Sequence, residues 1–320
     1  MTRRRALLAG LAAAALARPG LAAPQPAPVL RMGDQRGNVR ALMEAAGLLD
    51  DLPYRIEWSE FAAAAPLVEA LAAEAVDGGN IGDAPFTFAV AGGVPIRAVA
   101  SSRSNPEGTA ILVPGASPVQ GFADLRGRRV ATGKGSVGHS LVLAALKRQG
   151  WDAGGVQLVF LLPSDAKVAL AAGAVDAWST WEPYTSQLEL LEGCRRVANG
   201  AGLVPGLGFQ AATASAIEAK GEVLADFVRR LAAARRWQRA NLDRYAARWA
   251  GLMGFPEAVP RQWFARAGDR VVESDEGVLR DLQRVIDLYG EAGLLRRRFE
   301  AASALDARFN AAVRQGNEGA

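Results

Sequence analysis

A glycine-rich turn ahead of a helical pattern is the segment best suited to do chemistry, and the chemistry it suits is anion binding. The turn Gly133-Lys134-Gly135-Ser136 follows a strand-like run, Arg129–Thr132, and precedes a helical run from Leu141 to Arg148. The first turn of a helix leaves backbone N–H groups unpaired and carries a partial positive charge. With the Ser136 hydroxyl added, three or four hydrogen bonds of about 1.5–3 kcal/mol each would hold a sulfonate, sulfate or carboxylate.

Two glycines of this motif, Gly135 and Gly138, would let a ligand come close to the backbone on either side of Ser136 and Val137. The alternative interpretation is that Ser136 simply caps the helix, and both interpretations stay open. A nucleotide P-loop is excluded, because the glycine spacing that such a loop requires is missing.

Other chemistries lack the residues that they need. His139 is the only histidine and Cys194 the only cysteine, so neither a transition-metal site nor an internal disulfide has enough ligands or partners. A catalytic pair of Ser136 and His139 would need an orienting acid that the sequence does not indicate. There is no nucleophile elbow and no dinucleotide fingerprint. We therefore expect a binding protein and not an enzyme, with no cofactor.

An internal repeat indicates which elements position the site. The run Ala70–Asp77 recurs 99 residues later as Ala169–Asp176, with seven of eight residues identical. Each copy leads through a short apolar stretch to an acid, a proline and an aromatic residue, in Asp83-Ala84-Pro85-Phe86 and in Glu182-Pro183-Tyr184. The repeat predicts two similar lobes, each contributing one loop to a shared cleft.

The two loops after the repeats differ in the groups they offer. Asp83-Ala84-Pro85 is expected to begin a helix with Asp83 as its N-cap, leaving backbone donors facing the cleft. Trp181 is expected to cover an apolar part of the ligand, whereas Trp178 is expected to lie in the core. Glu182 has two open roles: it turns away to cap a helix or pair with an arginine, or the ligand also carries a positive group.

Strand-like and helix-like runs alternate as far as Phe209, after which long helical patterns dominate. This order predicts an α/β protein with two lobes, each a mostly parallel sheet flanked by helices. We expect a discontinuous lobe 1 of residues 24–113 plus 212–320, and a lobe 2 of residues 114–211. The strand-like run Ala110–Val113 is a candidate for crossing between them.

The amino terminus has the pattern of an export signal. Three arginines, Arg3 to Arg5, precede an apolar run from Ala6 to Ala17, and a small-x-small pattern predicts cleavage after Ala23. Residues 1–23 are thus a predicted signal peptide, similar to a twin-arginine signal, for a soluble, exported protein. The leader holds four arginines and no acids, so the net charge of +4 falls to 4 − 4 = 0 after cleavage. We therefore expect no binding to nucleic acid.

Taken together, five short runs resemble one known family: the substrate-binding proteins of bacterial ABC importers for aliphatic sulfonates, taurine and nitrate. The matching runs keep the family's order and include Arg31–Arg36, Trp58–Phe61 with Leu67–Leu71, Gly82–Pro85, Lys134–His139 and Asp176–Tyr184. Sulfonate binders usually carry Ser-Ser-Ala-His where this chain has Ser136-Val137-Gly138-His139, and Gly-Asp-Thr-Pro where it has Gly82-Asp83-Ala84-Pro85. Two side-chain hydroxyls are absent, which makes the expected pocket more apolar.

The resemblance implies a type II periplasmic-binding-protein fold with two lobes joined by a two-strand hinge. It implies a ligand held by Gln35, the Asp83–Pro85 loop, the Ser136–Gly138 turn and Trp181, to which Glu182 is added as a neighbour. The implied ligand is a small organic anion, an aliphatic sulfonate or a taurine-like molecule. The implied partners are an ABC permease in the inner membrane with its ATPase, and the protein itself is expected to be monomeric. Nitrate, a thiamine-precursor-like molecule, a sensor role and, less favoured, a pyrimidine-precursor synthase-like enzyme remain alternatives.

Overall fold

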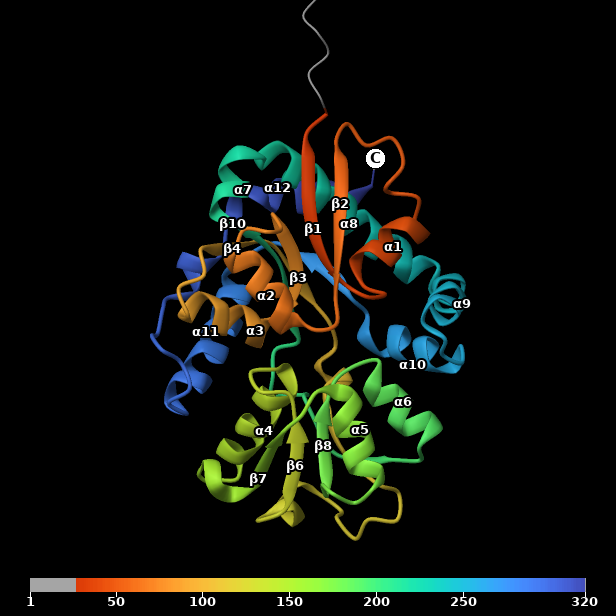
Figure 1. The fold of residues 1–320 in the computed structure, drawn as a ribbon, viewed down its shortest axis with the longest axis vertical. Helices are drawn as coiled ribbons and strands as arrows, with labels where there is room; N and C mark the ends of the chain where they lie inside the picture. Colours follow the sequence, from red (N-terminus) through yellow and green to blue (C-terminus); the bar gives the residue numbers. More distant parts are fainter. Residues whose placement is uncertain (1–26, 320) are drawn as a thin grey trace, which may run out of the picture.

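Two mixed β-sheets, each covered by helices on both faces, form the two lobes of this computed structural model, which describes residues 27–319 (Figure 1). The predicted α/β, two-lobed class is confirmed. The predicted signal peptide, residues 1–23, lies outside the described residues. Within the described part of the chain, no helix combines the length and the apolar character that crossing a membrane requires.

Lobe 1 is built on a six-stranded sheet with the order β11-β4-β10-β3-β1-β2. Its strands are β1 (Val29–Gln35), β2 (Arg55–Phe61), β3 (Gly78–Gly82), β4 (Ile96–Arg103), β10 (Leu207–Thr213) and β11 (Arg270–Val272). Strands β1, β2 and β3 run parallel, whereas β10 runs antiparallel to both β3 and β4. The sheet is therefore mixed, and not mostly parallel as predicted, because β10 enters it from the opposite direction.

Helices cover both faces of this sheet and bury the alternate apolar side chains of its strands. One face packs against α1 (Val39–Ala45), α7 (Ala214–Ala219), α8 (Gly221–Ala240), α9 (Leu242–Met253), α10 (Ala258–Ala267) and α12 (Asn310–Glu318). The other face packs against α2 (Ala64–Ala72), α3 (Asp83–Ala91) and α11 (Glu276–Glu291). Leu30 and Met32 of β1 point to the first face and Ile81 of β3 points to the second.

Lobe 2 has a five-stranded sheet with the order β7-β6-β8-β5-β9. Its strands are β5 (Ala110–Val113), β6 (Arg129–Thr132), β7 (Gln157–Phe160), β8 (Ala177–Thr180) and β9 (Arg195–Asn199). Helix α4 (Val137–Arg148) covers one face, and α5 (Pro163–Ala171) and α6 (Tyr184–Leu191) cover the other. Here too the sheet is mixed: β6 is parallel to β7 and β8, whereas β5 is antiparallel to β8 and β9.

Two segments, residues 104–109 and 200–206, join the lobes. Lobe 2 therefore begins and ends at other residues than the expected 114 and 211. Strand β5 was expected in lobe 1 but pairs with β8 and β9 of lobe 2, and β10 begins in the expected lobe 2 but belongs to the sheet of lobe 1. Ala110–Val113 is a run of four buried apolar residues, a pattern that fits the centre of either sheet. Pairing partners far along the chain, and not the local sequence, decide such cases.

The internal repeat corresponds to equivalent structural units. The first copy forms the end of α2 and the turn into β3, and the second forms the end of α5 and the turn into β8. The aspartate that closes each copy accepts a hydrogen bond from a backbone N–H in the neighbouring strand: Asp77 from Arg31 at 2.7 Å, and Asp176 from Arg129 at 2.9 Å. Each aspartate also pairs with the guanidinium of the same arginine. The repeated aspartate thus fastens equivalent strands in the two lobes.

Candidate functional site

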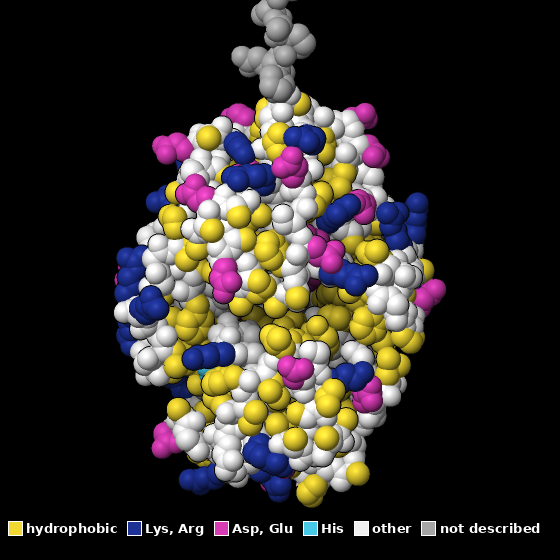
Figure 2. Space-filling view, in the orientation of Figure 1, with side chains coloured by type: hydrophobic (Ala, Val, Ile, Leu, Met, Phe, Trp, Pro, Cys, Tyr) yellow, Lys and Arg dark blue, Asp and Glu magenta, His cyan; other side chains and the backbone are white. Residues whose placement is uncertain are grey.

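Four strand ends define where the two lobes face each other. β1 and β3 of lobe 1 end at Gln35 and Gly82, and β6 and β8 of lobe 2 end at Thr132 and Thr180. Parallel strands end at one edge of a sheet, and ligands of open α/β sheets bind outside that edge. Figure 2 shows a hollow between the lobes whose visible walls are mostly hydrophobic side chains. All the residues expected to bind the ligand lie in or next to loops that follow these four strand ends.

The start of α4 supplies backbone donors. Ser136 is its N-cap, and the Ser136 hydroxyl accepts a hydrogen bond from the His139 N–H at 3.2 Å. Capping of the helix by Ser136 is therefore real, but it uses only one of the first N–H groups. Among residues 27–319 no acceptor pairs with the N–H groups of Val137 and Gly138, so these two donors are unpaired there.

Gly138 is required by packing between α4 and β8. A Cβ at this position would lie 2.5 Å from the Ser179 carbonyl oxygen and 2.8 Å from Thr132 Oγ1. The Ser179 hydroxyl also donates to the Gly138 carbonyl at 2.7 Å. Gly138 thus brings the helix start against the strand, which is a different role from the close ligand approach that the sequence indicates. Gly135 does adopt a left-handed conformation, with φ of 70°.

The loops of the two lobes meet at Val137. A Cβ on Gly82 would lie 3.3 Å from Val137 Cγ1, so the start of α3 packs against the start of α4. Ala84 is fully buried and belongs to the hydrophobic core of lobe 2, although its helix is part of lobe 1. The structure therefore brings the Asp83–Pro85 loop and the Ser136–Gly138 turn together across the cleft.

The start of α3 differs from the expectation. The N-cap is Gly82, and Asp83 is the first helical residue. The Asp83 carboxylate accepts the N–H of Ala84 at 2.7 Å, and Pro85 has no N–H. This helix end therefore has fewer free donors than predicted. Burial raises the pKa of Asp83 to about 7, and hydrogen bonds from the backbone of Ala84 and Leu207 oppose that rise.

Gln35 lies beside this loop at the end of β1. The Gln35 Nε2 donates to the Asn80 carbonyl at 3.1 Å, and its side chain is half-buried. The preceding residue, Asp34, is buried and accepts the N–H groups of Val39 and Arg40, so it caps α1 in place of Asn38. Burial raises the pKa of Asp34 to about 6. The loop after β1 thus carries a capping carboxylate where the equivalent loop of lobe 2 carries the neutral Ser136.

Trp181 lies next to the α4 turn. A Cβ on Gly133 would lie 3.8 Å from Trp181 Cη2, and the Trp181 ring contacts Tyr184 edge-on, with ring centroids 6.1 Å apart. Trp181 is half-buried, which leaves part of the indole for an apolar ligand group. Trp178 is 1% exposed in the lobe 2 core, as predicted.

Glu182 is occupied by protein partners. Its carboxylate accepts the Ser186 N–H and hydroxyl at 2.9 and 3.0 Å and pairs with Arg266 Nη1 at 2.6 Å. Of the two roles left open by the sequence, the geometry matches the first, in which Glu182 caps a helix and pairs with an arginine. Burial raises the pKa of Glu182, and the bonds from Ser186 and the charge of Arg266 oppose this rise.

Tyr289 contacts the candidate site, and the sequence did not single it out. It lies on α11 of lobe 1, and its hydroxyl donates to the Ser136 carbonyl of lobe 2 at 3.0 Å. Its ring packs edge-on against Phe88 and His139. Burial raises the pKa of Tyr289 well above its usual value, and the charge of Asp83 adds to the rise. Its position in an ordinary amphipathic helix 153 residues from Ser136 gave no local signal.

The single histidine offers a direct test of this geometry. His139 is 2% exposed, and its Nδ1 accepts the Gly135 N–H at 3.2 Å. Burial, with the nearby Lys134 charge, lowers the pKa of His139 from 6.5 to about 4. We expect the His139 resonance to titrate well below pH 6 by NMR in the folded protein and near pH 6.5 in urea. A folded-state midpoint near 6.5 would show that His139 is exposed.

The same shift predicts a loss of stability in acid. A histidine whose pKa is lowered by folding adds stability above its unfolded pKa of 6.5, and that stability is lost as the pH falls towards 4. The expected loss from His139 is about 3 kcal/mol, from about 1.36 kcal/mol for each pKa unit. The free energies of unfolding of the original protein and of His139→Gln, compared at pH 6.5 and at pH 4, isolate this contribution.

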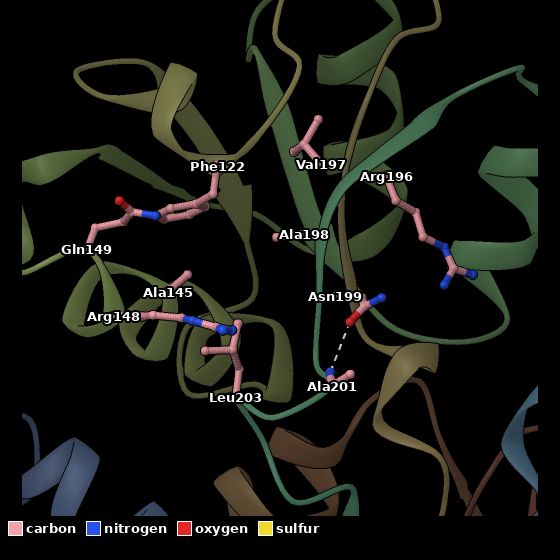
Figure 3. A pocket seen from close by; sticks show the side chains of 10 residues that line it. All are labelled: Phe122, Ala145, Arg148, Gln149, Arg196, Val197, Ala198, Asn199, Ala201 and Leu203. Carbon is pink, nitrogen blue, oxygen red and sulfur yellow. Dashed lines mark hydrogen bonds between the residues drawn. The ribbon is translucent and has the colours of Figure 1, made fainter.

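A second concavity lies on lobe 2, away from the cleft. It has a volume of about 490 Å³ and lies between the carboxyl end of α4 and strand β9, with Phe122 and Arg148 in its wall (Figure 3). Arg196 belongs to the wall, but its guanidinium binds Glu189, and Asn199 Oδ1 accepts the Ala201 N–H. None of the expected site residues lines this concavity.

The fold and the site define a class: a two-lobed ligand-binding protein with its site between the lobes. Residues 59–234 match the protein family described as NMT1/THI5 like, and the chain belongs to this family. It is 34% identical to an aliphatic sulfonates-binding protein of Escherichia coli K12 over 72% of this chain and 73% of that protein.

Solved structures show the same relationship. The alkanesulfonate-binding protein SsuA of Xanthomonas axonopodis pv. citri, in a structure with bound MOPS, matches with a TM-score of 0.79 and 31% identity. The match covers 88% of this chain and 99% of that one. The desulfurization enzyme DSZB, in complex with biphenyl-2-sulfinic acid, shares the fold at 18% identity and a TM-score of 0.65, over 90% of this chain and 99% of the enzyme. The fold alone therefore does not separate binding from catalysis.

Proposed function

We propose that this protein is the solute receptor of an ABC importer, which binds a small aliphatic sulfonate between its lobes and delivers it to a permease. The relatives that carry sulfonate-binding names support the ligand class. On this proposal the mature protein acts in the periplasm as a monomer, after removal of the signal, and its partners are an inner-membrane permease and ATPase. It needs no cofactor and does not transform its ligand.

The observation that carries the proposal is the start of α4. Within residues 27–319 the N–H groups of Val137 and Gly138 have no acceptor, Ser136 caps the same turn, and Val137 packs against Gly82 where the lobes meet. A sulfonate has three acceptor oxygens that share one negative charge, which suits several neutral donors at a helix start. Its alkyl chain suits the apolar hollow and the free part of the Trp181 ring.

The charges around this site favour alkanesulfonates over taurine. Taurine carries an ammonium group, which binds best to a free carboxylate. Glu182 is paired with Arg266, and Asp83 is buried and accepts the Ala84 N–H. We therefore expect a simple alkanesulfonate to bind more tightly than taurine, because neither carboxylate is available for the ammonium.

A ligand panel tests the proposal. Residues 24–320 are titrated by calorimetry and thermal denaturation with butanesulfonate, MOPS, taurine, pentanoate and nitrate. We expect butanesulfonate or MOPS to stabilise the fold by about 2.7 kcal/mol at 100 times the dissociation constant. Mass spectrometry of the released ligand should find it unchanged. Stabilisation by nitrate alone, or by none of these anions, would refute the sulfonate proposal.

A further inference from the structure

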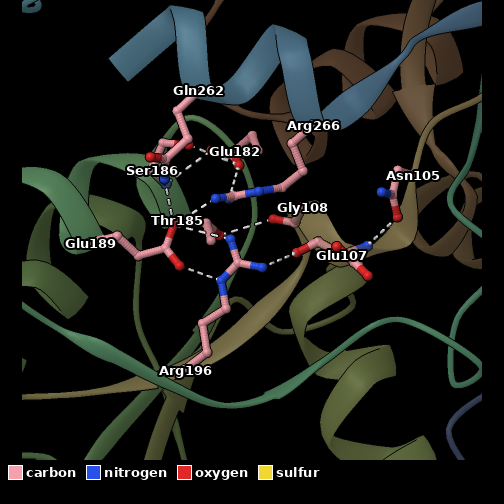
Figure 4. A network of polar contacts seen from close by, with 10 residues as sticks. All are labelled: Asn105, Glu107, Gly108, Glu182, Thr185, Ser186, Glu189, Arg196, Gln262 and Arg266. Carbon is pink, nitrogen blue, oxygen red and sulfur yellow. Dashed lines mark hydrogen bonds and ion pairs between the residues drawn. The ribbon is translucent and has the colours of Figure 1, made fainter. Parts of the chain in front are cut away.

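We infer that Arg266 is a positioning residue for the ligand loop of lobe 2, and that the cluster around it holds the lobes together on one flank of the cleft. The cluster, called the interlobe cluster below, consists of Glu182, Glu189, Arg196, Gln262 and Arg266 (Figure 4). The link to ligand binding rests on the proposed function, whereas the link to lobe closure does not.

The contacts cross from one lobe to the other. Arg266 and Gln262 lie on α10, which packs on α9 of lobe 1, while the two glutamates lie in lobe 2. Arg266 Nη1 is 2.6 Å from Glu182 Oε1, and Nη2 is 2.8 Å from Glu189 Oε2. Gln262 Nε2 donates to the same Glu189 oxygen at 2.7 Å. One face of α10 is thereby joined to the ligand loop and to α6.

The cluster also contacts one of the two segments that join the lobes. Arg196 of β9 pairs with Glu189, and its Nη1 donates to the Glu107 carbonyl at 3.1 Å. The Thr185 hydroxyl donates to the next carbonyl, that of Gly108, at 2.9 Å. Because residues 104–109 are a crossing segment, the cluster ties α10, α6, β9 and the hinge into one unit.

Burial makes the contribution of Arg266 hard to replace. The Glu182 and Arg266 side chains are only 6% and 15% exposed. Although burial favours the neutral acid, hydrogen bonds from Arg196 and Arg266 lower the pKa of Glu189. Without Arg266, Glu182 would keep only its bonds to Ser186 and would be a buried charge with no paired cation. Since Trp181 directly precedes Glu182, a displaced Glu182 displaces the aromatic wall of the site.

Separating the lobes on this flank must break both bonds of Arg266. On the opposite flank, Lys147 of α4 pairs with Glu291 of α11, but these side chains are 61% and 50% exposed. An exposed pair contributes little, whereas a buried pair with good geometry resists separation. We therefore expect the interlobe cluster, and not the Lys147 pair, to slow the release of a bound ligand.

Stopped-flow binding of MOPS tests the role of Arg266. We expect Arg266→Met to raise the dissociation rate at least tenfold with a change in association rate below threefold, and Arg266→Lys to recover part of the loss. Lys147→Met, which breaks the exposed pair, should dissociate MOPS as the unmodified protein does. Unchanged dissociation in Arg266→Met would overturn the inference.

A double variant separates positioning from simple stability. Glu182→Gln in the Arg266→Met background removes the unpaired buried charge, so the midpoint of thermal unfolding should recover while MOPS dissociation stays fast. If dissociation recovers together with the midpoint, Arg266 has only a structural role and the inference fails.

A distance measurement tests the role of Arg266 in lobe closure without any ligand. Spin labels at Ala72→Cys and Ala171→Cys, at equivalent exposed positions of the repeat, report the separation of the lobes in a Cys194→Ser background. Without ligand, Arg266→Met should shift the distance distribution to longer values, and an unchanged distribution would contradict the closure role. If the unmodified protein binds neither MOPS nor butanesulfonate, the proposed function fails, but this distance still decides the closure role.

Discussion

Ser136→Asp is expected to abolish binding of an organic anion while leaving the protein folded. Ser136 accepts the His139 N–H at the start of α4. Aspartate is as good an N-cap as serine, and its charge is favourable at a helix N-terminus. We therefore expect the free energy of unfolding to stay within about 1 kcal/mol of the original value.

Binding should respond very differently. The new carboxylate would lie beside the Val137 and Gly138 N–H groups, where the sulfonate is proposed to bind. Two like charges about 4 Å apart repel by about 4 kcal/mol at the effective dielectric constant of a protein surface, or about a thousandfold in affinity. Ser136→Asn is the matched control, because it keeps the cap without the charge. Equal affinities of the two variants in calorimetry would place the anion elsewhere.

Gly138→Ala has the second large expected effect. In an ordinary helix this substitution stabilises by about 1 kcal/mol, but here the new Cβ would lie 2.5 Å from the Ser179 carbonyl oxygen. A backbone atom cannot swing away, so the first turn of α4 must move off β8. We expect the free energy of unfolding to fall by about 2 kcal/mol in urea denaturation, and anion affinity to fall because the donor N–H groups move.

Gly251→Ala is the control for Gly138→Ala. Gly251 lies within α9, and nothing lies within 4 Å of a Cβ built there. This variant should be as stable as the original protein or up to about 1 kcal/mol more stable. If Gly138→Ala behaves in the same way, close packing against Ser179 does not fix the start of α4.

Local sequence predicted those parts of the fold that repeat. Ala70–Asp77 and Ala169–Asp176 specify the same helix–strand unit, and Asp77 and Asp176 make the same bonds to Arg31 and Arg129. A segment that occurs twice and ends each time in the same polar residue can be recognised as one structural unit from the sequence alone. The turn at Ser136 could also be predicted, because glycines and an N-cap residue precede apolar residues at helical spacing.

Contacts between distant segments could not be predicted. Arg266 follows Glu182 by 84 residues and looks in sequence like any solvated arginine of a helix. Strand β5 was expected in lobe 1 and β10 was divided between the two lobes, because short apolar runs fit either sheet. Asp83 was expected to be an N-cap, but the N-cap is Gly82 and Asp83 is the first helical residue. Its carboxylate accepts the Ala84 N–H, a donor that was expected to face the ligand.

The two lobes offer different groups to the cleft, and this difference sets the expected orientation of the ligand. The helix start of lobe 2 is capped by a neutral hydroxyl and keeps two free N–H groups, whereas in lobe 1 Asp34 caps α1 and Asp83 occupies the start of α3. An anion is therefore expected on the α4 side of the cleft, with its apolar part towards Trp181 and the hydrophobic hollow.

A crystal structure of the mature protein with MOPS tests this claim most directly. We expect sulfonate oxygens within hydrogen-bond distance of the Val137 and Gly138 N–H groups and the Ser136 hydroxyl, with the morpholine ring against Trp181. A sulfonate bound at the start of α3, or in the concavity beside β9, with the α4 donors facing water, would contradict it.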